Sequence, residues 1–365
     1  MSEAAPAADR RHLLELDPTA LTEWFTEHGE PGFRAGQVLS WIYERGVTDF
    51  AAMTNLSKLL REGMEREFVL YRSQIIRRGA STDGTVKLLL QWPDGATSEC
   101  VLIPTETRRT ACISSQVGCP AKCRFCASGL DGLERNLTHG EIIEQTLRVS
   151  AEATASGARL SNVVFMGLGE PLANYEAVMR AVRTINAPWG LNIGARKITV
   201  STVGLPKMIR KLAGEGLQLN LALSLHAPSD ALRQELIPWA EKIGLQELSA
   251  ACGHYFEKTG REITLEYILL HNVNDRQQHA AQLARFCKLF RCNVNLLRYN
   301  PVEGLPYERP TTESAHSFVE YLRDHGVNAH IRTSRGLDID AACGQLRRKV
   351  RAEGTVSLTV GRTQD

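Results

Sequence analysis

The pattern that most constrains this chain is an alternation of short β-branched runs with longer helical segments. Six such runs are ACISS at 111–115, NVVFMG at 162–167, KITVST at 197–202, LNLALSLH at 219–226, ITLEYILL at 263–270 and VNLLRY at 294–299. Their spacing of roughly 20 to 45 residues is the length of a βα unit, which predicts a parallel sheet covered by helices. Because a closed barrel needs about eight units, we expect an α/β protein with a partial, TIM-like (β/α)6 barrel.

The chain before the barrel has a different periodicity. Apolar residues recur at helical spacing between residues 13 and 68, and one helix is predicted at 56–64 with Thr54 or Asn55 as its N-cap. From Thr85 onward the residue pattern becomes that of β-strands. TVKLLLQW and ATSECVLIP flank a Pro-Asp-Gly turn at 93–95, which predicts a β-hairpin.

These changes of pattern predict four parts. They are a small helical N-terminal accessory domain at 1–84, a linking β-hairpin at 85–109, a core domain at 110–347 and a basic C-terminal tail at 348–365. We expect the accessory domain to bind RNA.

Composition limits the compartment and the partners. The sequence begins MSEAAPAADRRHLLEL, which has no apolar segment of a secretory signal, and no apolar run approaches the ~20 residues that cross a bilayer. We therefore expect a cytoplasmic protein without membrane contact. The formal net charge of +2 does not by itself indicate nucleic acid, so an RNA partner would have to use local basic patches, such as those at 72–78 and 347–351.

The nine cysteines are the most informative residues for chemistry. An odd number in a reducing compartment argues against a disulfide framework. Cys119, Cys123 and Cys126 follow the first barrel strand as GCPAKCRFC, and three thiolates on one loop suit zinc, copper(I) or an iron–sulfur cluster. Structural zinc usually takes two separated pairs of ligands, and a second pair is absent from this sequence.

Four cysteines normally hold a [4Fe–4S] cluster, so three would leave one iron open to a substrate or cofactor. Two other interpretations remain at this point. Cys112 or a histidine could complete a zinc site, or the three cysteines could be buried without a ligand.

Polar or glycine-rich residues follow several predicted strands. They are Gly167-Leu168-Gly169-Glu170-Pro171, Ser201-Thr202, Ser224-Leu225-His226 and Asn300-Pro301. In an α/β barrel, the carboxyl ends of the strands form the catalytic rim. Each segment taken alone is more typical of a cap or a turn.

Several longer segments carry a resemblance to a known family. They are FRAGQVLSWIY, MTNLSKLLRE, QVGCPAKCRFCASG, RNLTHGEIIEQ, FMGLGEPLANY, ITVSTVGLP, LALSLHAP and RGLDIDAACGQL. In this order they resemble the radical S-adenosylmethionine superfamily and, within it, the RlmN family of ribosomal and transfer RNA adenine C2-methyltransferases. The similarity runs from about residue 30 to residue 347.

The resemblance implies two cofactors. Cys119, Cys123 and Cys126 would hold a [4Fe–4S] cluster whose open iron binds S-adenosylmethionine, of which two molecules are consumed per methylation. The residues that match the family's cofactor contacts are Gly169, Glu170, Ser201, Ser224, Leu225, His226 and Asn300. Leu168 stands where the family usually has methionine, a difference that should not matter if the glycine backbone and the carboxylate hold the cofactor.

The resemblance also implies a mechanism. Cys343 would be methylated on sulfur to S-methylcysteine, and a 5′-deoxyadenosyl radical would then remove a hydrogen from that methyl group. The resulting carbon radical would add to C2 of adenine, giving a covalent RNA–protein adduct. Glu99 matches the family's proton acceptor, and Cys112 would release the product through a transient disulfide with Cys343.

The implied substrates are adenosine 2503 of 23S ribosomal RNA and adenosine 37 of some transfer RNAs. A reductant such as flavodoxin or ferredoxin would supply electrons to a monomeric enzyme. Two alternatives remain from the sequence: the related C8-methylating antibiotic-resistance branch, and a non-catalytic zinc or iron–sulfur electron-transfer protein. The other cysteines, Cys100, Cys252, Cys287 and Cys292, match no role and are assigned to packing.

Overall fold

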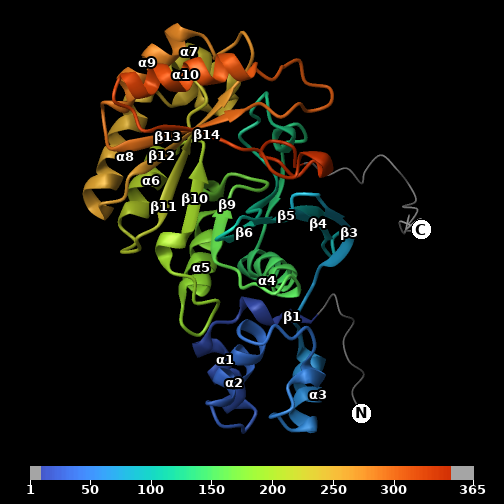
Figure 1. Cartoon of the computed structure of the whole chain (residues 1–365). Helices are drawn as coiled ribbons and strands as arrows, with labels where there is room; N and C mark the ends of the chain where they lie inside the picture. Colours follow the sequence, from blue (N-terminus) through green and yellow to red (C-terminus); the bar gives the residue numbers. More distant parts are fainter. Residues whose placement is uncertain (1–9, 347–365) are drawn as a thin grey trace, which may run out of the picture.

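A computed structural model describes residues 10–346 of the chain (Figure 1). The basic run at 347–351 and the predicted tail at 348–365 lie outside the described residues. Among the helices of residues 10–346, none is long and apolar enough to cross a membrane.

Within residues 10–346, ten strands form one sheet in the order β14-β13-β12-β11-β10-β9-β6-β5-β4-β3. Neighbouring strands from β6 to β14 pair in parallel, and those from β3 to β6 pair antiparallel. The strands are β3 (Gln74–Ala80), β4 (Val86–Gln91), β5 (Thr97–Pro104), β6 (Arg109–Cys112), β9 (Asn162–Phe165), β10 (Ile198–Thr202), β11 (Asn220–Ser224), β12 (Ile263–Leu269), β13 (Cys292–Arg298) and β14 (Ala329–Arg332).

The predicted partial barrel is confirmed, with two strands that were not predicted. All six predicted barrel strands are present, and β14 adds a seventh parallel strand at one edge. At the other edge, β3 lies beside the predicted hairpin of β4 and β5. The sequence QIIRRGA of β3 is largely exposed and has no apolar alternation. Its charged residues are typical of an edge strand, where they discourage pairing with other chains.

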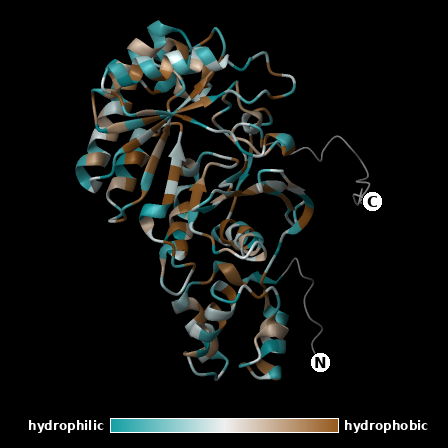
Figure 2. Cartoon of the chain, viewed as in Figure 1, coloured by the Kyte–Doolittle hydropathy of each residue, from teal (hydrophilic) through white to brown (hydrophobic). Residues whose placement is uncertain are grey.

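Helices connect the parallel strands and cover one side of the sheet (Figure 1). They are α4 (His139–Ala155), α5 (Tyr175–Asn186), α6 (Pro206–Ala213), α7 (Asp230–Leu236), α8 (Leu245–Thr259), α9 (Gln277–Cys287) and α10 (Thr312–Asp324), with 3-10 turns η4 (Pro171–Asn174), η5 (Ala195–Lys197), η6 (Pro238–Lys242) and η7 (Leu337–Ile339). Fully buried Val163, Ile198, Leu221 and Leu265 belong to the core between sheet and helices. In Figure 2 the sheet strands carry many hydrophobic residues, whereas the outer helices carry many hydrophilic ones.

The N-terminal part forms a group of helices at one end of the molecule (Figure 1). Its elements are β1 (Arg11–His12), η1 (Leu13–Glu15), α1 (Pro18–Glu27), α2 (Arg34–Tyr43), η2 (Phe50–Ala52), α3 (Lys58–Glu67) and β2 (Phe68–Val69). The predicted N-cap at Thr54 or Asn55 is wrong, because Ser57 caps α3 by accepting from the Leu60 N–H at 3.2 Å.

Two carboxylates fasten this N-terminal part to α4. Glu15 accepts a hydrogen bond at 2.7 Å from the backbone N–H of Gly140, in the first turn of α4. Fully buried Glu144 accepts from the backbone N–H groups of Arg72 at 2.8 Å and Ser73 at 2.9 Å. Because an unpaired buried carboxylate is costly, these contacts fix how the N-terminal part sits on the barrel.

Candidate active site

A cavity lies where the parallel strands of the barrel end. Each parallel strand of the large sheet after β6 contributes a lining residue at or near its carboxyl end: Met166, Ser201, Ser224, Ile268, Leu297 and Arg332. This is the end at which α/β barrels carry their catalytic groups. This first cavity is also lined by the three cysteines of the GCPAKCRFC loop.

The cysteine loop is closed by a small antiparallel pair of strands, β7 (Gln116–Gly118) and β8 (Leu133–Asn136), with the 3-10 turn η3 (Ala127–Gly129) between them. Burial raises the pKa of Cys119 to about 12 and holds the pKa of Cys123 well above its usual value. The neighbouring thiols of the loop raise both pKa values further. Three thiols in such an environment are stabilised as thiolates by a positively charged inorganic centre.

Arg233 of α7 provides an independent test of whether such a centre fits. Its side chain is 1 % exposed, it has no carboxylate within 4 Å in the part of the chain described, and its Nε and Nη1 atoms have no hydrogen-bond partner there. Burial lowers the pKa of Arg233 to about 10, whereas the nearby Cys123 raises it. Since buried charges are normally paired, thiolates bound to a cluster would supply the missing negative charge.

The donor set also fits a cluster, since the three cysteines line one cavity. Over residues 10–346, no group of three or more His, Cys, Asp or Glu side chains is arranged to hold one metal ion. The three cysteines of a [4Fe–4S] cluster each bind a different iron, so their sulfurs need not converge on one point. The residues present therefore fit the cluster.

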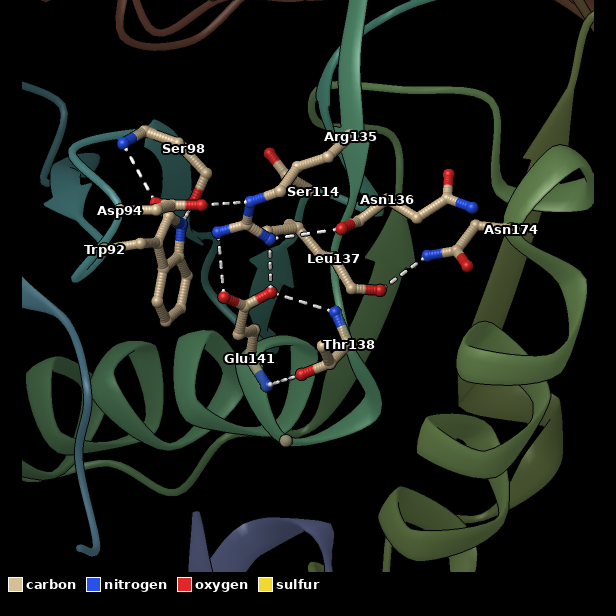
Figure 3. Close-up of polar contacts among 12 residues, drawn as sticks. Trp92, Asp94, Ser98, Ser114, Arg135, Asn136, Leu137, Thr138, Glu141 and Asn174 are labelled. Atoms are coloured by element: carbon tan, nitrogen blue, oxygen red, sulfur yellow. Dashed lines mark hydrogen bonds and ion pairs between the residues drawn. The ribbon is translucent and has the colours of Figure 1, made fainter. Parts of the chain in front are cut away.

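Arg135 of β8 anchors the end of the cysteine loop (Figure 3). Its guanidinium donates to both carboxylate oxygens of Glu141, at 2.8 and 2.9 Å, and to Asp94 in the hairpin turn. Glu141 in turn completes the capping box of α4 with Thr138. A bidentate pair of this kind fixes direction as well as distance.

The loop after β9 requires glycine at one position. Gly169 has a φ of 105°, and a Cβ there would lie 2.7 Å from Ser115 Oγ and Gln116 Cβ. The Leu168 side chain is buried, while its carbonyl accepts from Ser115 N–H at 2.9 Å. The backbone thus passes close to the cysteine loop whichever apolar side chain stands at Leu168.

Glu170 places a carboxylate in the first cavity. It is 2 % exposed and accepts from the backbone N–H groups of Val203 at 2.8 Å and Leu172 at 3.0 Å. Burial raises the pKa of Glu170 to about 7 against these hydrogen bonds. A carboxylate held in this way is suited to accept from a ligand ammonium.

The other residues predicted to contact the cofactor divide into two groups. Ser201, Ser224 and His226 line the first cavity. His226 Nδ1 accepts from Ile268 N–H at 3.1 Å, so its Nε2 carries the proton, and burial lowers the pKa of this histidine to about 3. Leu225 is fully buried in the core and is not among the described residues that line the cavity.

Asn300 lies in a second cavity, which adjoins the first. Its Nδ2 donates to the Cys343 carbonyl at 3.3 Å, and its Oδ1 accepts from Ser334 Oγ at 2.9 Å. These bonds make Asn300 a support for the segment that carries Cys343.

Cys343 borders both cavities, and Cys112 borders the second. Both cysteines are free thiols. Burial, and to a smaller extent the nearby Cys343, raises the pKa of Cys112 to about 12. The cysteine loop also holds the Cys343 segment, since Ala127 N–H donates to the Gly344 carbonyl at 2.8 Å. The structure thus brings together two thiols that are far apart in the sequence.

Arg332 is a site residue that the sequence reasoning missed. It ends β14, borders both cavities, and lies near the thiols of Cys343 and Cys112 and the carboxylate of Glu266, which together raise its pKa. Its charge favours a thiolate at Cys112, because it acts to lower the pKa that burial raises there. No sequence signal marked Arg332, because the short strand that carries it was not predicted. The sequence reasoning also missed Arg233, because an arginine in a helix is usually an ordinary surface residue.

Glu99 is not among the described residues that line either cavity. It is 3 % exposed on β5, and its carboxylate lies 3.2 Å from Lys87 Nζ. Lys87 also reaches the segment that carries Cys343, as described below.

Comparison with known proteins identifies the family. Residues 11–70 match the ribosomal RNA large subunit methyltransferase N-terminal domain, and residues 113–284 match the radical SAM superfamily. A probable dual-specificity RNA methyltransferase RlmN of Rhodopirellula baltica is 45% identical over 93% of this chain and 91% of its own length. The same-named protein of Thermosynechococcus vestitus is 47% identical over 92% of this chain and 98% of its own.

A solved structure agrees with these matches. The crystal structure of a radical SAM methyltransferase from Sphaerobacter thermophilus superposes with a TM-score of 0.90, at 44% identity, over 92% of this chain and 99% of that one. The matches overturn the alternative of a non-catalytic zinc or electron-transfer protein. The chain belongs to the RlmN family of radical S-adenosylmethionine RNA methyltransferases, which use a [4Fe–4S] cluster and S-adenosylmethionine.

Proposed function

We propose that this enzyme methylates C2 of adenine, at adenosine 2503 of 23S ribosomal RNA and at adenosine 37 of transfer RNAs. The single observation that carries the proposal is the position of Cys343, which borders both the cavity of the three loop cysteines and the cavity of Cys112. A thiol in that position can receive a methyl group from a cofactor in the first cavity and can form a disulfide with Cys112 in the second. Relatives named as dual-specificity RNA methyltransferases support the choice of two RNA substrates.

The cofactor site is assigned to residues of the first cavity. Cys119, Cys123 and Cys126 would bind the cluster. Gly169, Glu170, Ser201, Ser224 and His226 would hold S-adenosylmethionine, together with the backbone of Leu225 and with Asn300. When bound, the cluster and S-adenosylmethionine supply the methyl group and the radical that activates it.

The chain's own residues would carry out the later steps. Cys343 accepts the methyl group on sulfur and bonds through that carbon to C2 of adenine. Glu99 accepts the proton that leaves C2, and the one electron left unpaired by the radical addition would return to the oxidised cluster. The Cys112 thiolate attacks the sulfur of Cys343, so that a sulfur–sulfur bond forms and the carbon–sulfur bond breaks. The released carbon keeps the electron pair and takes up a proton to become the methyl group, and a cellular thiol re-reduces the disulfide.

The wider setting follows from this chemistry. An oxygen-sensitive cluster and a disulfide that must be reduced in every cycle suit the reducing cytoplasm. A small electron carrier such as flavodoxin or ferredoxin would reduce the cluster, and the enzyme would act as a monomer.

We assign RNA binding to the predicted accessory domain, residues 1–84, acting with the barrel. A third cavity lies at their junction and is lined by Arg11, Arg72 and Arg180, together with Glu15 and Glu176. Thr138 and His139, at the start of α4, also line this cavity. An RNA strand could therefore contact the arginines and present its adenine to the first cavity after the base leaves its stack.

Nucleoside mass spectrometry tests the proposed reaction. RNA from cells that lack the protein should contain no 2-methyladenosine at the two positions, and the modification should return when the gene is restored. A methyl group found at C8 instead would assign the enzyme to the antibiotic-resistance branch. Unchanged 2-methyladenosine in the deletion strain, with no second enzyme of this family in the cell, would reject the proposal.

An arginine of the junction should contribute to RNA affinity through phosphate. We expect Arg11→Ala to raise KM for RNA by about tenfold, roughly 1.4 kcal/mol, and to reduce the salt dependence of log KM by roughly 0.7–0.9 per lost phosphate contact. The control is Arg291→Ala. Arg291 directly precedes the amino end of β13, away from the carboxyl ends that line the active site, and pairs with Glu262. Equal effects of the two variants would argue against a phosphate contact at Arg11.

A further inference from the structure

We infer that Lys87 is a positioning residue that holds the base Glu99 and the Cys343 segment in one fixed relation. The inference rests on the proposed function, in which Glu99 accepts the C2 proton. The ammonium of Lys87 lies 3.2 Å from Glu99 Oε1 and donates to the Asp340 carbonyl at 3.0 Å. Asp340 precedes Cys343 by three residues.

The strand register explains why these two side chains meet. Lys87 on β4 is paired with Val101 on β5, which makes Glu99 its diagonal neighbour on the same face of the sheet. Diagonal neighbours on antiparallel strands lie within reach of long side chains. On the opposite face, Leu88 and Cys100 belong to the large hydrophobic core beneath α4.

The face of Lys87 and Glu99 is covered by the segment that carries Cys343. Val101 packs in one hydrophobic cluster with Cys112, Ala341 and Leu346. The Lys87 and Glu99 side chains are 15% and 4% exposed, so the ion pair is largely removed from water. Burying a carboxylate costs desolvation free energy, and the ion pair with Lys87 offsets part of that cost.

The turn between β3 and β4 holds the Cys343 segment at two other points that do not involve Glu99. Gly336 N–H donates to Asp83 Oδ2 at 2.9 Å, and Thr82 N–H donates to Asp338 Oδ2 at 3.3 Å. Fastening of the segment is thus shared by several contacts, whereas Lys87 touches both the segment and the base. Its specific effect should therefore fall on the step that needs both, which is the resolution of the RNA adduct.

The experiment follows single turnovers with purified, cluster-loaded enzyme. In Lys87→Met, S-methylcysteine should form at Cys343 as in the wild type, but decay of the RNA adduct should slow on the order of 100-fold, the cost of misplacing a reacting group by about 1 Å. Lys87→Arg should restore much of the rate, because a guanidinium can reach the same two oxygens. Adduct is measured on denaturing gels and by peptide mass spectrometry.

A double-mutant cycle separates positioning from mere stability. If Lys87 acts through Glu99, then Lys87→Met combined with Glu99→Gln should resolve the adduct no more slowly than Glu99→Gln alone. Asp83→Asn is the matched control, because it loosens the same segment without touching Glu99. Asp83→Asn should leave the rate of adduct decay within a few-fold of the wild-type rate. Its melting temperature should equal that of Lys87→Met, so that the two variants are compared at the same stability.

Three results would overturn the inference. Normal adduct decay in Lys87→Met would show that the ion pair is dispensable. Equal slowing in Asp83→Asn would reduce the role of Lys87 to fastening the segment. Normal decay in Glu99→Gln would instead refute Glu99 as the base, which is a failure of the proposed function and removes the inference with it.

Discussion

Replacement of Cys343 by alanine is expected to abolish RNA methylation while the cluster stays in place. The side chain of Cys343 borders both cavities, and the reaction as proposed passes the methyl group through its sulfur. Loss of a covalent nucleophile typically costs on the order of 10⁴-fold or more in rate. Methyl transfer to a 23S ribosomal RNA fragment should fall below detection, and iron and sulfide content should match those of the wild type.

The control for this result is Cys292→Ala. Cys292 begins β13, at the opposite end from the active site, and is half-buried. We expect that variant to methylate RNA normally. Transfer of a methyl group by Cys343→Ala at a rate near that of the wild type would contradict the proposed mechanism, even if the product were 2-methyladenosine.

Replacement of Cys112 by alanine is expected to trap the enzyme on its RNA. The first part of the reaction uses the first cavity and Cys343, which this change leaves intact. The attack on the Cys343 sulfur would lack its nucleophile, so an RNA–protein adduct should accumulate to nearly one per active enzyme. It should migrate as a slow band on denaturing gels, be sensitive to ribonuclease, and carry a nucleotide on the peptide that contains Cys343.

The double variant with alanine at both Cys112 and Cys343 distinguishes this adduct from nonspecific cross-linking. No adduct should form when Cys343 is absent. Recovery of free RNA alone from the Cys112→Ala variant would count against the resolving role of Cys112.

The thiol of Cys112 must also ionise to react. Burial raises the pKa of Cys112 to about 12, and the positive charge of Arg332 acts to lower it. Arg332 thus supports the attack in the proposed mechanism.

Much of the barrel was predictable because its elements have local patterns. Runs of β-branched residues at βα spacing predicted all six barrel strands, since β-branched side chains favour strands and the spacing leaves room for a helix between them. The edges of the sheet were not predictable in this way. β3 is charged and exposed, and β14 reads AHIR with two polar residues among its four, so neither carries the apolar pattern of a central strand.

The site was partly predictable for a similar reason. Cys119, Cys123 and Cys126 occur within one short loop, so their spacing alone indicated an inorganic centre. The roles of Cys112, Cys343 and Glu99 came from motifs and not from spacing. Asn300 was expected to bind the cofactor, whereas its hydrogen bonds in the structure support the Cys343 segment.

The sequence by itself determined the class of fold, the family and the loop that binds the cluster. The fold class and the cysteine loop depend on patterns within about 45 residues, where local geometry controls which side chains share a face, and the family depends on the order of short motifs along the chain. Tertiary structure was needed to bring Cys112 beside Cys343, to pair Lys87 with Glu99 and to set Arg332 between the cavities. Those contacts depend on strand register and on the return of the C-terminal segment over the sheet, and neither leaves a periodic trace in the sequence.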